Sequence, residues 1–393
     1  MHCLVRRLVF GLRCRHSIRN AGSKADETLN KYDSPLRRLI QDASTFGEVG
    51  AAVPAEGELQ WATQPYTTDG KEETRSYIDP KETTVLLFPG QGSQRVGMGQ
   101  RLLEVPAARE LYDLASSIVG WNVGRVCREG PAEELDRRCQ TAVLVTSLGA
   151  LELARDTRPA AVERVRAVAG FSLGEITAMV FAGALQFEQA LRLVELRAAA
   201  MAAASAERSG GMLTVWLAPD ASLPRLLAAA RDHAAAAGLP DPVCAVANYL
   251  FPGCKVLAGD EEALQFVERS GRAWGVRRSA RVRVAGAFHC ALMARAEAAV
   301  RAALRQCAVS APRVRVVSCV DARAVRDAAG ARRRLARLTA APVRWEQALH
   351  ALYARPPEQP QPLTLALGPG AALRSTLKLV NARAWDASLQ IDV

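Results

Sequence analysis

The stretch Gly170–Gly174, with the sequence GFSLG, constrains this chain more than any other, because it joins a strand pattern to a helix pattern through one tight turn. The apolar run Val165–Gly170 predicts a short buried strand, and Leu173–Ala182 predicts a helix. In that setting GxSxG builds a strained turn that raises a serine hydroxyl above a sheet. The pentapeptide alone is moderately specific, and a tight turn carrying an ordinary polar residue is the alternative.

Ser172 is the candidate nucleophile. It stands at the N-terminus of the predicted helix, where the helix dipole and the N–H of Leu173 favour negative charge on an acyl oxygen. A serine of this kind needs a general base, which is normally a histidine.

Elimination among the five histidines leaves one candidate base. His2 and His16 lie in a basic N-terminal segment, and His233 and His350 lie in helix patterns typical of surface or packing residues. His289 follows the strand pattern Ser279–Val284 and a turn, a position at which α/β sheets present functional groups. The alternative for His289 is that it caps the helix that follows.

A third catalytic group is not evident. The only acid with the chain order and setting of a hydrolase triad is Asp260, after a strand pattern. Glu261, Glu262 and Ala263 follow it, so a helix N-cap is the favoured interpretation of Asp260. A backbone carbonyl can instead orient His289 by accepting its Nδ1–H.

Length and cysteine content narrow the protein class. The chain has 393 residues, of which 49% are hydrophobic, enough for one large domain or two to three smaller ones. Nine cysteines without a CxxC pair argue against a disulfide framework or a zinc site and favour a reducing compartment. No window approaches the roughly 18 consecutive apolar residues of a membrane span.

The N-terminal segment 1–25 has the composition of a mitochondrial transit peptide. It holds six cations among apolar residues and no acid before Asp26. Without those six, 45 Lys and Arg stand against 40 Asp and Glu, and the net charge falls from +11 to +5. We therefore do not infer nucleic-acid binding from the high charge, although a basic nucleic-acid arm is the alternative.

The remaining chain predicts an α/β fold with a hydrolase-like core, a mainly parallel sheet and helices on both faces. Residues 26–80 read as a polar linker, and the folded body begins near Thr84. We expect one large domain from residues 81–208 and 286–393. Its predicted strands are Thr84–Phe88, Val165–Ala169, Val314–Ser318 and Leu363–Leu367, and its predicted helices include Ala142–Leu153, Phe187–Ala204, Leu292–Leu304 and Trp345–Tyr353.

Residues 209–285 change to a β-α-β-β-α-β pattern, which predicts a small inserted ferredoxin-like subdomain. Its predicted elements are Met212–Trp216, Leu223–Ala236, Val243–Val246, Lys255–Ala258, Glu261–Arg269 and Ser279–Val284. An insertion next to the GxSxG turn would form a cleft over Ser172.

Four separated motifs together resemble the malonyl-CoA:acyl carrier protein transacylases, in particular the mitochondrial form. These are GQGSQ at 90–94, GFSLG at 170–174, Arg197 within ELR, and GAFH at 286–289. The likeness runs from about Thr84 to near Trp385. Phe171 replaces a histidine common in bacterial members, and Arg344 replaces a glutamine common in many.

The resemblance implies a role for each matching residue. Ser172 is the nucleophile and His289 its base, and the backbone N–H groups of Gln91 and Leu173 form the oxyanion hole. Arg197 binds the malonyl carboxylate, although from the sequence alone it is an ordinary helix-surface arginine. The other implied site residues are Asn248 in the active site, Phe288 as a bulky ring that selects malonyl groups, and Arg344 with the backbone that steadies His289.

The expected reaction is ping-pong transfer of a malonyl group from malonyl-CoA, through Ser172, to the phosphopantetheine thiol of acyl carrier protein, in the mitochondrial matrix. Neither a metal nor a dissociable cofactor is expected, and the protein is expected to act as a monomer. Candidate docking surfaces for the acidic carrier are Arg277, Arg278, Arg281 and Arg283, or Arg332–Arg334 with Arg337. The alternatives are a serine thioesterase or esterase, and a non-catalytic scaffold that binds the carrier.

Overall fold

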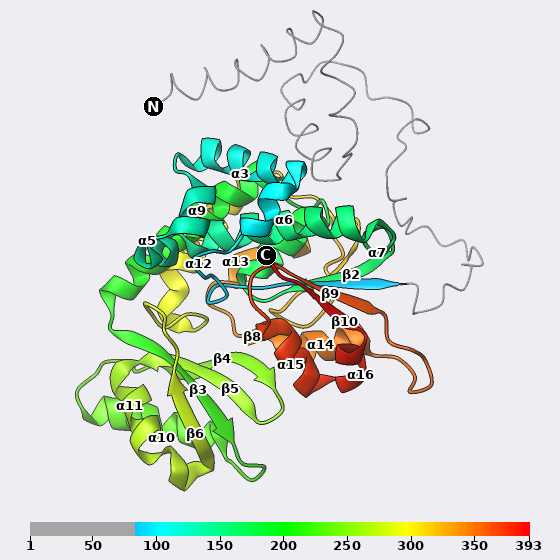
Figure 1. Ribbon diagram of the computed structural model, residues 1–393. Helices are drawn as coiled ribbons and strands as arrows, with labels where there is room; N and C mark the ends of the chain where they lie inside the picture. Colours follow the sequence, from blue (N-terminus) through cyan, green and yellow to red (C-terminus); the bar gives the residue numbers. More distant parts are fainter. Residues whose placement is uncertain (1–82) are drawn as a thin grey trace, which may run out of the picture.

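A computed structural model describes residues 83–393 (Figure 1). The transit peptide expected over 1–25 and the linker expected over 26–80 lie outside the described residues. Within residues 83–393, no helix combines the length and the apolar character that crossing a membrane requires.

One sheet is entirely parallel, which confirms the predicted fold class. Its strands, in spatial order, are β10 (Ser388–Ile391), β9 (Leu363–Leu367), β1 (Thr84–Phe88), β2 (Val165–Gly170) and β7 (Arg315–Val317). All four neighbouring pairs run parallel. The central strand β1 and its neighbour β2 are almost wholly buried, as continuous apolar runs covered on both faces should be.

Helices cover both faces of this sheet (Figure 1). On one side lie α3 (Pro106–Val119), α6 (Cys139–Thr157), α9 (Phe187–Glu207), α12 (Ala294–Leu304) and α13 (Ala328–Arg337); on the other lie α14 (Trp345–Tyr353), α15 (Ala372–Val380) and α16 (Ala382–Asp386). Shorter elements complete the layers: η3 (Gln100–Glu104), α4 (Val123–Glu129), α5 (Ala132–Arg137), α7 (Pro159–Glu163), α8 (Leu173–Phe181) and η5 (Ala291–Met293).

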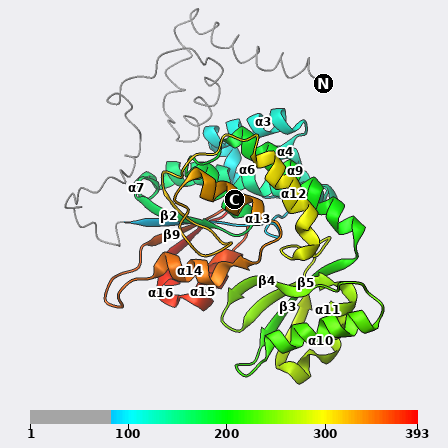
Figure 2. The ribbon, with the colours of Figure 1, turned by 180° about the vertical axis from the view of Figure 1, so that it is seen from behind.

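The second sheet is mixed and is built mostly from the predicted insertion. Its order is β6 (Val276–Arg281), β3 (Gly210–Leu217), β5 (Cys254–Asp260), β4 (Cys244–Phe251) and β8 (Val343–Arg344). The helices α10 (Leu223–Ala236) and α11 (Glu261–Ser270), with the short η4 (Gly271–Trp274), pack on this sheet away from the parallel one (Figure 2). The β-α-β-β-α-β order agrees with the prediction.

Two features of this sheet were not predicted. β8 comes from the C-terminal part of the chain and pairs in parallel with β4, so Asn248 lies opposite Val343. The last strand ends at Arg281, whereas the sequence pattern predicted Ser279–Val284. The strand also begins earlier, at Val276. β3 continues to Gly210, beyond the residue that pairs with Arg281, but the N–H of Val282 makes the last bond to it, at the carbonyl of Met212, and the N–H of Val284 turns back to the carbonyl of Val282.

Candidate active site

The turn between β2 and α8 holds Ser172 in a strained conformation. Its φ is 50° and its ψ is −107°, outside the ordinary regions for a residue with a side chain. The flanking glycines permit the turn, because a Cβ on Gly170 would lie 1.9 Å from the carbonyl carbon of Gly174, and one on Gly174 would lie 2.1 Å from the carbonyl oxygen of Phe88. The strand-to-helix turn predicted from GxSxG is therefore present, with its serine at the start of α8.

Ser172 and His289 form a dyad. The Ser172 Oγ lies 2.9 Å from the His289 Nε2, and both side chains are buried. On the other side of the ring, Nδ1 lies 3.1 Å from the carbonyl oxygen of Ala341. Because a carbonyl only accepts, Nδ1 carries the proton and Nε2 is left to take the proton of the serine.

The histidine is thus oriented by Ala341, and the expectation for Arg344 is wrong. Arg344 lies in β8, where its backbone pairs with Tyr249 of β4 and its N–H donates to the carbonyl of Cys319. Its guanidinium lies over the Tyr249 ring, 5.6 Å from the centroid. The chain between α13 and β8 passes His289 before the strand begins, so the orienting carbonyl belongs to that connection rather than to the strand.

The surroundings of His289 keep its imidazole neutral. Burial, and after it the nearby positive charge of Arg197, lower its pKa to about 3. A base that is unprotonated across the physiological range is ready to accept a proton from Ser172.

Arg197 completes the cluster from the middle of α9. It is only 1% exposed, its Nη2 donates to Ser172 Oγ at 3.0 Å, and its Nη1 donates to Gln140 Oε1 at 2.7 Å. Its Nε has no hydrogen-bond partner, and within residues 83–393 no carboxylate pairs with it. Burial lowers the pKa of Arg197 to about 10. A buried guanidinium without a carboxylate is costly, so this arrangement favours an anionic ligand.

Gln140 is a site residue that the sequence interpretation missed. It lies in the first turn of α6, is 3% exposed, and its Nε2 donates to the Gln91 side chain at 3.4 Å while its Oε1 accepts from Arg197. The sequence signal that could have found it is the single amide side chain of Gln140 next to Thr141, directly before a long apolar helix pattern. A polar residue at a core-facing helix position is rarely buried without a partner.

The two expected oxyanion-hole residues lie on adjoining segments, the start of a helix and a loop. Leu173 is the first residue of α8, and Gln91 lies in the loop after β1. The loops are in close contact, because a Cβ on Gly90 would lie 2.4 Å from the carbonyl oxygen of Phe171. The ring of Phe171 packs edge-on against Trp345, with centroids 5.6 Å apart, so its side chain serves the core.

Asn248 lies on β4 opposite Val343 of β8, and Phe288 directly precedes His289 in the loop 286–290. Asn248 is 8% exposed, and its Oδ1 has no hydrogen-bond partner among the described residues. Phe288 packs in a small apolar cluster with Met201 and Met212.

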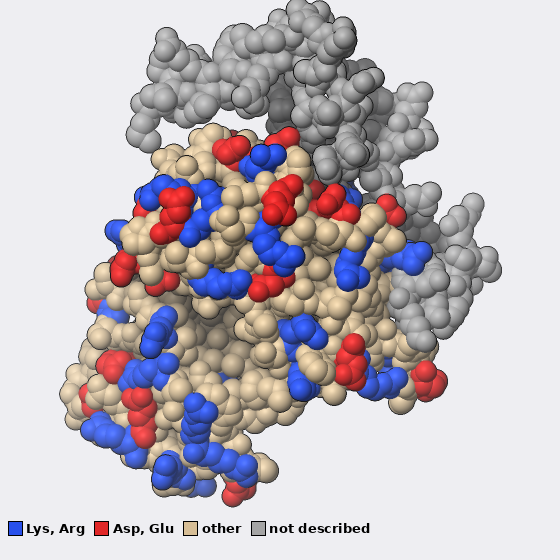
Figure 3. Space-filling view, viewed as in Figure 1, with Lys and Arg blue, Asp and Glu red and all other residues tan. Residues whose placement is uncertain are grey.

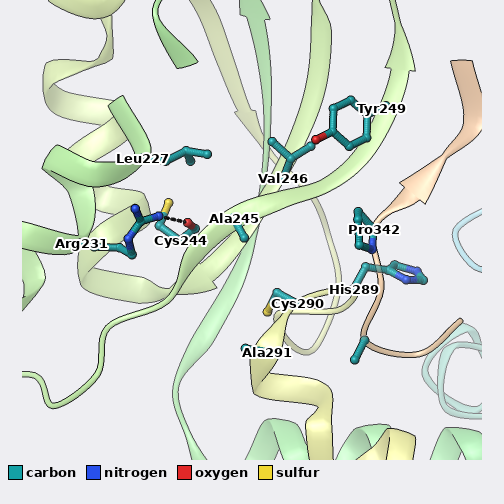
Figure 4. A pocket seen from close by; sticks show the side chains of 11 residues that line it. Leu227, Arg231, Cys244, Ala245, Val246, Tyr249, His289, Cys290, Ala291 and Pro342 are labelled. Atoms are coloured by element: carbon teal, nitrogen blue, oxygen red, sulfur yellow. Dashed lines mark hydrogen bonds between the residues drawn. The ribbon is translucent and has the colours of Figure 1, made fainter. Parts of the chain in front are cut away.

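A cavity of about 420 Å³ reaches the histidine loop from the β4 side (Figure 4). It is lined by α10, by β4 and by the chain at Ala340 and Pro342. The imidazole of His289 points away from Arg231 and Cys244 in this view. Among residues 83–393, no group of three or more His, Cys, Asp or Glu side chains is arranged to hold a metal ion.

Asp260 is not part of the dyad, and it stands at a helix N-cap as expected without capping the helix through its side chain. It occupies the N-cap position of α11, but its side chain makes no cap hydrogen bond. Its carboxylate instead accepts from Arg208 Nε at 2.5 Å and Nη2 at 2.8 Å, and from the N–H of Val243. Arg208 follows the end of α9, so this ion pair fastens the crossing from the parallel sheet to the second sheet.

Comparisons with known proteins agree with this geometry. The acyl transferase domain model matches residues 85–359. A protein of Drosophila melanogaster named probable malonyl-CoA-acyl carrier protein transacylase, mitochondrial, is 43% identical, over 82% of this chain and 85% of the relative. The human mitochondrial malonyl-CoA-acyl carrier protein transacylase is 40% identical, over 87% of this chain and 85% of the relative.

A solved structure extends the likeness to three dimensions. It holds a malonyl-transacylase in complex with its type II PKS acyl-carrier protein and superposes with a TM-score of 0.68 at 29% identity, covering 77% of this chain and 94% of that one. The nucleophile turn, the dyad and the buried arginine lie within the matched region. The chain therefore belongs to the acyl transferase family and, within it, to the malonyl-CoA-acyl carrier protein transacylases.

Proposed function

We propose that this protein transfers a malonyl group from malonyl-CoA to the phosphopantetheine thiol of acyl carrier protein through a malonyl-Ser172 intermediate. His289 takes the proton of Ser172 as Oγ attacks the thioester carbonyl, and returns it to the departing thiolate of coenzyme A. The N–H groups of Leu173 and Gln91 stabilise the tetrahedral oxyanion. The carrier thiol then attacks the acyl-serine by the same steps in reverse.

The position of Arg197 is the observation that carries this proposal. Its guanidinium is buried, has no carboxylate partner within the described residues, and touches the hydroxyl that would carry the acyl group. A malonyl group on Ser172 brings a free carboxylate to that place, where a planar guanidinium can bind it with two hydrogen bonds. Gln140 holds Arg197 from the other side, and Phe288 limits room for an α-branch.

For the acidic carrier we propose the face of β6 with Arg277 and Arg278. Of the two basic groups, Arg281 is paired with Glu261 and Glu268, and Arg334 is paired with Asp321. Arg277 and Arg278 are exposed on an edge strand. Figure 3 shows basic side chains gathered over the β3 and β6 end of the molecule, next to a hollow between the two sheets. Such a surface would attract an acidic partner.

The proposal includes a compartment, an oligomeric state and a domain division. The expected presequence and the names of the relatives support a mitochondrial location, and within the mitochondrion we propose the matrix. The chemistry uses only a serine, a histidine and two thioesters, so we propose no cofactor, and the dyad is complete within one chain, which supports a monomer. We propose that residues 209–285 form the small subdomain.

Intact-protein mass spectrometry after mixing with malonyl-CoA tests the proposal. We expect a malonyl adduct on the parent protein that is discharged by added acyl carrier protein faster than by water. Ser172→Ala should give no adduct and Arg197→Ala a much weaker one. Arg192→Ala is the matched control, because Arg192 lies on the same helix but is exposed. Rapid loss of the adduct to water with no effect of the carrier would instead identify a thioesterase, and the absence of any adduct would favour a scaffold.

A further inference from the structure

The carboxyl group of Glu175 is buried directly behind the Ser172 turn, and the dyad makes no use of it. Glu175 lies in the first turn of α8, is 0% exposed, and its own N–H donates to the carbonyl of Ser172 at 2.9 Å. Most of its neighbours on α8 are apolar and equally buried. Because burying a carboxyl group lowers stability, an apolar residue would stabilise the fold more at this position. The presence of the carboxyl group therefore suggests a function for it.

The contacts of Glu175 indicate what that function is. Its Oε2 accepts a hydrogen bond from the N–H of Cys319 at 2.7 Å, across to the segment that follows β7. Burial raises the pKa of Glu175, and interactions with Ser318 and Cys319 oppose that rise. The carboxyl group therefore ties the nucleophile helix to the end of the neighbouring strand.

The same segment leads on to His289. The carbonyl of Cys319 accepts the N–H of Arg344 at 2.6 Å. Three residues before Arg344, the carbonyl of Ala341 faces His289 Nδ1 at 3.1 Å. The carbonyl of Thr339 also accepts the backbone N–H of His289 at 3.2 Å. A continuous path of hydrogen bonds and short backbone steps thus runs from the Ser172 turn to both the ring and the backbone of the histidine.

We propose that Glu175 is a positioning residue that holds the two halves of the dyad in register by accepting the N–H of Cys319. The inference rests on the proposed role of Ser172 as nucleophile. Within residues 83–393 no carboxylate contacts His289, and the carbonyl groups of Ala341 and Thr339 hold its ring and its backbone, so the position of that connection decides the Ser172–His289 distance. A displacement of about 1 Å in such a contact can lower a rate about 100-fold.

The test compares Glu175→Gln with Glu175→Met in the full-length chain. A fluorophosphonate probe reports the reactivity of Ser172 directly: the Oγ–P bond forms, the P–F bond breaks, fluoride leaves and the serine proton passes to His289. We expect Glu175→Gln, whose amide oxygen still accepts the Cys319 N–H, to label within about threefold of the parent rate. Glu175→Met should label about 30-fold more slowly.

Two further readouts separate positioning from general damage. Free malonate should protect Ser172 from the probe by binding Arg197, and the malonate concentration needed for protection should stay within about twofold of the parent value in both variants. A thermal unfolding transition of Glu175→Met should show that this variant is folded. Glu152→Met is the matched control, because Glu152 is a buried carboxyl on α6 about 18 Å along the helix from Gln140. It should label at the parent rate.

Three results would overturn the proposal. In the first, Glu175→Met labels at the parent rate; in the second, Glu175→Gln labels as slowly as Glu175→Met. In the third, a smaller fraction of the Glu175→Met molecules becomes labelled, but those molecules label at the parent rate. A parent protein that does not label would instead refute Ser172 as nucleophile. The failure of this inference and the failure of the proposed function are therefore distinguishable.

Discussion

The guanidinium of Arg197 and the hydroxyl of Ser172 are joined by a hydrogen bond of 3.0 Å in the protein interior. Arg197 lies in α9 and Ser172 in the turn before α8, and His289 approaches the same Oγ from a third part of the chain at 2.9 Å. One oxygen thus meets both a base and a fixed positive charge. An acyl group formed on that oxygen starts within reach of the guanidinium, which links the chemistry of attack to the recognition of a carboxylate.

Replacing Arg197 with alanine should remove the preference for carboxylated acyl groups. A charge-assisted hydrogen bond contributes about 1.5–3 kcal/mol, so kcat/KM for malonyl-CoA should fall about 10- to 100-fold. Acetyl-CoA lacks the carboxylate, and its kcat/KM should fall far less. Steady-state assays with both thioesters measure the ratio, and Arg192→Ala should leave it unchanged. An equal loss for both substrates would show that Arg197 supports the fold rather than specificity.

The low pKa of His289 predicts an unusual pH profile. Because its pKa is about 3, the imidazole stays neutral and the single-turnover rate of Ser172 acylation should be flat from pH 8 down to about 5. An ordinary histidine would cause a fall near pH 6.5. His289→Gln should lower the rate about 10²- to 10⁴-fold at every pH. A midpoint near 6.5 in the parent would contradict the buried, neutral base.

The same shift affects stability. Between pH 6.5 and about 3, the unfolded chain protonates this histidine while the folded protein does not, so the free energy of unfolding should fall as the pH falls through that window. Chemical unfolding at pH 7 and pH 5 measures the difference. His289→Gln should reduce it, whereas His350→Gln, at an exposed site, should leave it unchanged. Equal slopes in the parent and His289→Gln would refute the linkage.

Gly174→Ala should destroy the nucleophile turn. Its Cβ would lie 2.1 Å from the carbonyl oxygen of Phe88, and the next nearest atoms are also backbone, of Phe88 and Pro89, so no flexible side chain can move aside. Overpacking of this kind costs about 1–3 kcal/mol or more, and we expect a lower thermal midpoint and at least a 100-fold loss of probe labelling. Gly211→Ala is the control, since the nearest atom to its Cβ is 3.4 Å away. Normal labelling of Gly174→Ala would mean that the turn tolerates expansion.

Asp260→Asn should lower stability without affecting the chemistry. It weakens the ion pair with Arg208 and should cost about 2 kcal/mol in denaturant unfolding, while the acylation rate stays within twofold. Loss of a true triad acid would lower the rate about 10⁴-fold. Asp232→Asn, on the exposed face of α10, serves as the control for stability. A large loss of rate in Asp260→Asn would reinstate Asp260 as a catalytic acid.

Local patterns predicted much of the fold because periodicity and turn chemistry depend on neighbouring residues. Thr84–Phe88, Leu223–Ala236 and Trp345–Tyr353 have the bounds expected from the sequence. The sequence pattern predicted the bounds least well where pairing with a neighbouring strand determines whether a segment is a strand. The last strand of the insertion ends at Arg281 because the chain turns away from β3 after Val282, and β8 is a strand only because β4 lies next to it.

The sequence by itself determined the nucleophile turn, because two glycines around Ser172 leave the backbone few other conformations, and it singled out His289 because only five histidines compete. Only the tertiary structure decided what orients His289, what Asp260 does and how Gln140 and Glu175 take part. Those contacts join residues that are far apart along the chain: Ala341 replaces Arg344, and Arg208 takes the carboxylate of Asp260. A sequence pattern reports what a residue prefers locally, whereas the direction of a carbonyl or a buried side chain depends on how distant elements pack.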